Sequence, residues 1–204
     1  MMQLRRLVPC VAALVFLALA GPSWATSIIQ PSFESLVSAA DYVVRVKVKS
    51  VDSSWQENPA RPGERYIGSQ VSLDILETIT GTPPRPLVLD VVGGQVGETK
   101  FVVDGTPELK TGDECILFVR GNGRAFFPVV ALVYGYFPVQ RDAKTGTAQV
   151  LRYDRRPLYG TDELAPGATT RAARSALERP LTPAAFRERI RQQQRDTLSR
   201  DRLR

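Results

Sequence analysis

The feature that most limits the fold of this chain is a series of short stretches in which apolar and polar residues alternate. Between Val44 and Lys49 three valines alternate with three basic residues, and a second alternating run contains Val71, Leu73 and Ile75. Because side chains on a strand point to opposite faces in turn, this period of two is typical of a strand with one buried face. Further strands are expected at Leu87–Val92, Lys100–Val103, Glu114–Arg120, Ala125–Ala131, Tyr134–Gln140 and Ala148–Tyr153.

Turn-forming residues separate these runs. Asp104-Gly105, Gly121-Asn122-Gly123 and the segment 142–146 all contain residues that adopt tight-turn conformations at little cost. Several short strands joined by frequent turns are typical of a small antiparallel barrel or sandwich. We therefore expect a mainly β domain, a closed or partly open barrel with a helix packed at one end.

Two helices are expected outside the strands. Ser32 is a suitable N-cap for a short helix, because apolar residues recur at helical spacing from Phe33 to Ala40. Near the C-terminus, Thr182 is the expected N-cap and Pro183 the first helical residue of a second helix.

The N-terminal 25 residues have the organisation of a secretory signal peptide. Arg5 and Arg6 precede an apolar run, Leu7–Ala20, and Ser23-Trp24-Ala25 fits the small-x-small pattern cleaved before Thr26. The apolar run is shorter than the roughly 20 residues that span a bilayer. We therefore expect cleavage between Ala25 and Thr26, no membrane span in the mature chain, and a secreted or periplasmic location.

These observations divide the chain into four parts. Residues 1–25 form the signal peptide, 26–153 the β-barrel domain, 154–180 a linker, and 181–204 a C-terminal helix and tail. The charge is uneven, because residues 152–204 carry 13 arginines against seven acidic residues. An arginine-rich end of this kind favours electrostatic binding of a polyanion or an envelope surface, although a solvated helix face explains the same charges.

The cysteine and histidine content excludes several classes of chemistry. Cys10 lies in the signal peptide, so Cys115 alone remains and the mature chain forms no intramolecular disulfide; Cys115 stands among apolar residues and is expected to be buried. The chain has no histidine. This excludes Ser-His-Asp and Cys-His hydrolases and histidine-ligated zinc sites, whereas carboxylate- or lysine-dependent enzymes remain open. No cofactor or metal is expected.

Several segments resemble a widespread group of secreted, functionally uncharacterised bacterial proteins. The resemblance rests on residues 39–48, on residues 71–81, and on the motifs Gly93-Gly94-Gln95-Val96-Gly97, Gly105-Thr106-Pro107 and Gly112-Asp113-Glu114. It covers roughly residues 28–137 and implies an extracytoplasmic role without indicating an activity.

The strand that begins at Ala40-Asp41 is also similar to the first strand of the N-terminal barrel of tissue inhibitors of metalloproteinases. This resemblance implies a small antiparallel OB-like barrel and, more loosely, an inhibitor-like role. Those inhibitors use an N-terminal cysteine held by disulfides, which this chain lacks. Thr26 and Ser27 would offer an amine and a hydroxyl in its place.

The candidate binding residues lie in two loops. Gly93, Gly94 and Gly97 let backbone approach a ligand closely, but no helix with a Lys-Ser/Thr start follows, so a turn or bulge beside another strand is favoured over a phosphate loop. Trp55 lies in a polar stretch, where it either anchors a partner or covers the barrel end.

We therefore expect a secreted, noncatalytic module that binds an unknown protein or envelope component through Trp55 and Gly93–Gly97. Two alternatives stay open, polyanion binding through the arginine-rich tail and a carboxylate- or lysine-dependent enzyme. Nucleic acid is not the expected partner.

Overall fold

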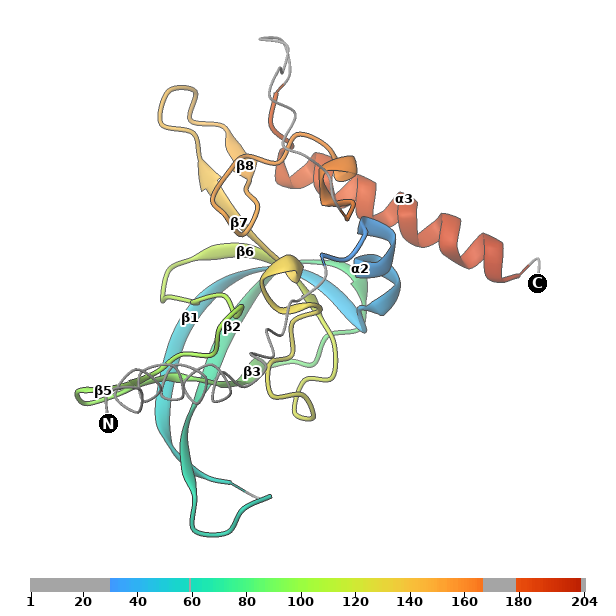
Figure 1. Ribbon diagram of the computed structural model, residues 1–204. Coiled ribbons are helices and arrows are strands. Elements are labelled where there is room, and N and C mark those ends of the chain that lie inside the picture. Colours follow the sequence, from blue (N-terminus) through green and yellow to red (C-terminus); the bar gives the residue numbers. More distant parts are fainter. Residues whose placement is uncertain (1–29, 59, 167–178, 203–204) are drawn as a thin grey trace, which may run out of the picture.

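The computed structural model describes residues 30–58, 60–166 and 179–202 (Figure 1). Its elements, in chain order, are α2 (Phe33–Ala39), β1 (Tyr42–Glu57), β2 (Arg65–Gly81), β3 (Leu87–Val92), β4 (Gly94–Val96), β5 (Thr99–Phe101), β6 (Glu114–Val119), η2 (Leu132–Gly135), β7 (Tyr136–Arg141), β8 (Ala148–Val150), η3 (Thr161–Leu164) and α3 (Pro183–Asp201). Six strands form one antiparallel sheet in the order β3-β2-β1-β6-β7-β8, and β4 and β5 form a separate hairpin.

The long hairpin of β1 and β2 is the centre of this sheet. Val44, Val46 and Val48 point to one face, as the alternation predicts, and Val51 rejoins the same face because the pairing with β2 shifts register between Val48 and Ser50. Such a shift inserts an extra residue and bends the strand. The bend carries the outer half of the hairpin away from the rest of the sheet (Figure 1).

The two faces of the sheet bury separate apolar clusters, because neighbouring residues on one strand point in opposite directions. The cluster that we call the helix-side core contains Phe33, Leu36, Val37, Val43, Ile79, Ile116, Phe118, Phe137, Val150, Leu158, Leu164, Phe186 and Ile190. The cluster that we call the pocket-side core contains Tyr42, Val44, Val46, Val48, Val71, Leu73, Leu87, Leu89, Leu109, Cys115, Leu117, Val119, Phe127, Val129 and Tyr136.

Both helices cover the helix-side core and lie beside each other (Figure 1). Each begins where the sequence predicts, because the Ser32 hydroxyl accepts from the Ser35 amide at 3.1 Å and the Thr182 hydroxyl accepts from the Ala185 amide at 3.2 Å. Phe186 of α3 is completely buried, with its ring centroid 4.9 Å from that of Phe137. Helix α3 therefore belongs to the packed body of the domain.

The two edges of the six-stranded sheet are covered by the chain itself. At β3, the Asn122 side chain donates to the Val88 carbonyl at 2.7 Å and accepts from the Asp90 amide at 3.4 Å. At β8, the Val150 amide donates to the Leu181 carbonyl at 2.8 Å. These outward-facing backbone groups of the two edge strands are thereby satisfied.

The mainly β, antiparallel fold predicted from the sequence is confirmed, but the described part of the chain contains no closed barrel. The prediction of a strand at Ala125–Ala131 is wrong. Its backbone bonds to two different strands, since the Phe126 carbonyl accepts from Val92 at 2.9 Å and the Val130 amide donates to Phe118 at 2.8 Å. Pro128, which has no N–H, lies between them. The segment therefore crosses from β3 to β6 without forming a ladder.

Leu158 and Cys115 are both buried by this packing. Leu158, in the region expected to be a linker, is completely buried in the helix-side core. Cys115 is a free thiol buried in the pocket-side core, as expected, and burial raises its pKa well above the ordinary value. Such a thiol is inert.

Candidate functional site

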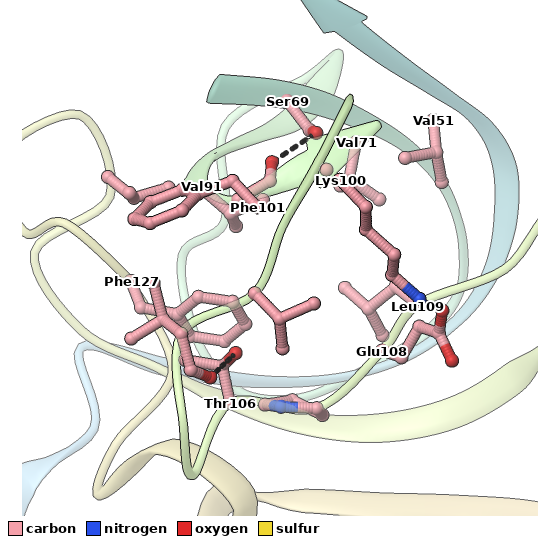
Figure 2. Close-up of a pocket in the computed structure, with 16 residues that line it drawn as sticks. Val51, Ser69, Val71, Val91, Lys100, Phe101, Thr106, Glu108, Leu109 and Phe127 are labelled. Atoms are coloured by element: carbon pink, nitrogen blue, oxygen red, sulfur yellow. Dashed lines mark hydrogen bonds and ion pairs between the residues drawn. The ribbon is translucent and has the colours of Figure 1, made fainter. Parts of the chain in front are cut away.

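A cavity of about 190 Å³ opens beneath the β4–β5 hairpin, at the end of the pocket-side core (Figure 2). We call it the apolar cavity. Strands β1 and β2 each contribute one valine to its wall and β3 contributes two, and the β4–β5 hairpin and the connections after β5 and β6 supply most of the remainder. The principal apolar lining residues are Val51, Val71, Val91, Val103, Leu109 and Phe127.

Two serine hydroxyls attach the hairpin to the sheet. The Ser69 hydroxyl, on β2, donates to the Gly93 carbonyl at 2.6 Å and lies 2.8 Å from the Ser53 hydroxyl on β1. The Ser53 hydroxyl in turn accepts from the Gln95 amide at 3.3 Å. Figure 2 shows the Ser69 contact at the upper wall of the cavity. The hairpin is therefore held in place by side chains of the long strands.

The glycines singled out in the sequence form this hairpin. A Cβ on Gly94 would collide with the hydroxyls of Ser53 and Ser69, so only glycine allows β4 to lie against the sheet. Gly97 has a φ of +59° at the hairpin turn. The structure confirms that Gly93–Gly97 form a turn beside a strand and not a phosphate loop, because the next element after them is the strand β5 and not a helix.

Exposed apolar side chains stand at the mouth of the cavity. Phe101 is 42% exposed and Val102 is 61% exposed, and both line the opening. A single exposed apolar residue is common on protein surfaces, whereas an exposed pair beside a concave apolar cavity is typical of a binding surface.

A small charged cluster lies at one side of the mouth. The Lys100 ammonium is 3.2 Å from Glu108, and Lys110 is 3.3 Å from the other oxygen of the same carboxylate. Hydrogen bonds from Lys100 and then Lys110 hold the pKa of Glu108 below its usual range. Two ammonium groups share one carboxylate, so the cluster carries a net positive charge.

The cavity is built for burial of an apolar group. An apolar protein cavity of about 150 Å³ stays dry and accepts benzene, so this volume fits one aromatic ring or a branched aliphatic side chain. The hydroxyl of Ser69 is already used to hold the hairpin. Over residues 30–58, 60–166 and 179–202, no group of three or more Cys, Asp or Glu side chains is placed to hold a metal ion.

The structure brings together some of the residues predicted from the sequence and separates others. Gly93 and Gly94 line the cavity, and Gly97 forms the turn above it. The prediction that Trp55 lies in a loop is wrong, because this residue belongs to β1 and pairs with Ile67 of β2. Trp55 does not line the cavity. Its side chain is 41% exposed, and the Arg65 guanidinium lies 5.5 Å from its ring. Thr26, Ser27 and the cleavage position after Ala25 lie outside the described residues.

The sequence patterns do not identify the residues at the opening of the apolar cavity. Phe101 and Val102 fall in a stretch predicted to be a strand, where one of two neighbours is expected to be buried, yet both are exposed. Leu109 follows a Gly-x-Pro turn, and nothing in its local pattern indicates a cavity. The usable signal is the run of three adjacent apolar residues, Phe101-Val102-Val103.

The arginines of α3 are partly neutralised by the domain. Arg187 lies 3.0 Å from Glu77 of β2, and Arg191 lies 3.7 Å from the same carboxylate. Arg200 lies 2.9 Å from Glu34 of α2. These three guanidinium groups hold the helix against the body of the domain.

In comparisons with known proteins, no family model matches this chain and no curated protein matches it significantly. Among the described residues, no helix is both long enough and apolar enough to span a bilayer.

Proposed function

We propose that this chain is a noncatalytic binding module whose apolar cavity receives an apolar side chain of a partner, either a protein or another component of the cell envelope. The observation that carries the proposal is an apolar cavity of about 190 Å³ with Phe101 and Val102 exposed at its mouth. Binding would cover both residues and fill the void, and burial of apolar surface contributes roughly 25 cal/mol per Å².

The attachment of the hairpin supports a preformed site. The Ser53 and Ser69 hydroxyls fix β4, and the absence of a side chain on Gly94 lets it lie flat on the sheet. A site fixed before binding loses less conformational entropy when the partner arrives. The positive cluster around Glu108 favours a partner with an acidic residue next to its apolar group.

We also propose that the fold is a partly open relative of the small OB-like barrel. The segment 126–130 bonds to β3 on one side and to β6 on the other, so it occupies the place where a closing strand would lie. In this interpretation the pocket-side core is the barrel interior and the apolar cavity is its open end. The expected export of the chain fits a binding role outside the cytoplasm.

The test is retention of partners from envelope and culture-supernatant fractions by the full chain and by three variants. Phe101→Ala removes an exposed ring at the mouth, and Leu109→Phe fills the cavity. Phe126→Ala is the matched control, because Phe126 is similarly exposed (55%) and does not line the cavity.

We expect a specific partner to be retained by the wild type and by Phe126→Ala, and to be lost from the other two variants. Truncation of a hot-spot residue costs about 2 kcal/mol or more, roughly a thirtyfold loss of affinity. Equal retention by all four proteins would show that the cavity is not the binding site.

A further inference from the structure

A second hollow, of about 470 Å³, is lined by residues of β1, β2 and β3 and by residues 123–126, and it shares Ser69, Val91 and Val92 with the apolar cavity. We call it the outer groove. Its polar and aromatic lining residues are Gln56, Tyr66, Gln70, Asp90, Arg124 and Phe126. Its volume is within the range of small-molecule sites, about 300–1,000 Å³. The proposed function does not use the residues that line this groove alone.

Gly68 lines the outer groove between Gln56 and Tyr66. This glycine pairs with Val92 of β3 and is not among the glycines with positive φ, so the backbone alone does not require glycine there. A Cβ would lie 3.0 Å from the Gln56 side chain and 3.4 Å from the Tyr66 ring. Glycine therefore allows these two side chains to lie close over the strand.

The polar groups of the outer groove combine donors with acceptors. Gln70 donates to the Asp90 carboxylate at 3.2 Å, which orients that carboxylate. Across the described residues neither Asp90 nor Arg124 has an ion-pair partner, so the groove carries one negative and one positive group with capacity for further hydrogen bonds.

An aromatic ring stands at the wall of the groove on a fixed backbone. The Phe126 carbonyl accepts from the Val92 amide at 2.9 Å, and the neighbouring Phe127 is buried in the pocket-side core. The Phe126 side chain is nevertheless 55% exposed. Its anchored backbone places an apolar ring beside amide, carboxylate and guanidinium groups.

We propose that the outer groove binds a neutral oligosaccharide. A sugar ring has an apolar C–H face that stacks on an aromatic ring, and its hydroxyls both donate and accept hydrogen bonds, which matches Phe126 and Tyr66 beside Gln70, Asp90 and Arg124. The opposite charges of Asp90 and Arg124 cancel. A phosphate-rich strand needs a positively charged groove, so the neutral ligand fits better than nucleic acid.

The test is a ¹H–¹⁵N NMR titration of the full chain with cellotriose, chitotriose and maltotriose as separate probes. We expect saturable shifts at Gly68, Asp90 and Gly123 with at least one trisaccharide, with a Kd on the order of 1 mM. Phe126→Ala should weaken binding about tenfold, and Asp90→Asn about fivefold. Phe101→Ala, which alters the other hollow, should bind the sugar as the wild type does.

The titration separates this inference from the proposed function. The inference would be overturned if none of the three probes caused shifts at about 10 mM, ten times the expected Kd. It would also be overturned if Phe126→Ala bound the sugar with unchanged affinity. If Phe101→Ala weakened sugar binding as much as Phe126→Ala does, that result would also overturn the inference. Partner retention through the apolar cavity is measured independently, so either proposal fails without the other.

Discussion

The two faces of the sheet are covered in different ways. On the helix side, α2 and α3 seal the core so well that Phe186 and Ile190 have no exposed surface. On the pocket side, the cover is a short hairpin and irregular loops, and about 190 Å³ stays empty. Helices present rows of side chains that fill the space above a sheet. A hairpin containing Gly93 and Gly94 has few side chains to offer, so the loop-covered face is where a ligand fits.

The largest expected effect comes from breaking the sealed face. Phe186→Ala removes a completely buried ring that packs against Phe33, Phe118 and Phe137. We expect a loss of about 3–5 kcal/mol in the free energy of unfolding, because the cavity left behind has no side chain to fill it. Urea denaturation measures this loss. The control is Leu198→Ala, at a 54% exposed position of the same helix, which should change the free energy of unfolding by no more than about 0.5 kcal/mol. Similar losses in both variants would contradict the packing described for α3.

Adding one methylene to each face should give effects of opposite sign. Val150→Ile inserts volume into the filled helix-side core and should cost about 1–3 kcal/mol. Val71→Ile adds the same volume beside the apolar cavity and should stabilise the protein by about 0.5–1 kcal/mol. The two denaturation midpoints should therefore lie on either side of the wild type. Destabilisation by Val71→Ile would mean that the cavity does not accept additional volume.

The smallest expected effect concerns the ion pairs that attach α3. Glu77→Gln removes the carboxylate shared by Arg187 and Arg191 and keeps nearly the same shape. We expect a decrease in the denaturation midpoint smaller than that of Val150→Ile, and diminishing with added salt, because partly exposed charges are screened. Glu64→Gln, which breaks an exposed pair with Arg61, serves as the control and should leave the midpoint unchanged. A salt-independent loss in Glu77→Gln would indicate a role in packing instead.

Local patterns in the sequence predict the strands and helices of both faces better than they predict the apolar cavity. The alternation of Val44, Val46 and Val48 and the capping residues Ser32 and Thr182 act between near neighbours, and the structure confirms them. The apolar cavity depends on contacts between distant segments, such as Ser69 with Gly93, which no local pattern reveals.

The strand expected at Ala125–Ala131 shows the same limit. Its composition favours a strand, but its hydrogen bonds go to β3 at Phe126 and to β6 at Val130. Tertiary pairing therefore overrides local preference in this segment. The result is a crossing segment that places Phe127 in the apolar cavity and leaves Phe126 beside the outer groove.

The amide of Asn122, which binds β3 as a peptide group of a neighbouring strand would, also bears on self-association. An uncovered edge strand is a template on which a second molecule adds its own strand, and repeated addition leads to aggregates. Asn122 occupies those positions at one edge of the sheet, and Leu181 does so at the other. At β3 and β8, these contacts therefore oppose the addition of a strand from a second molecule.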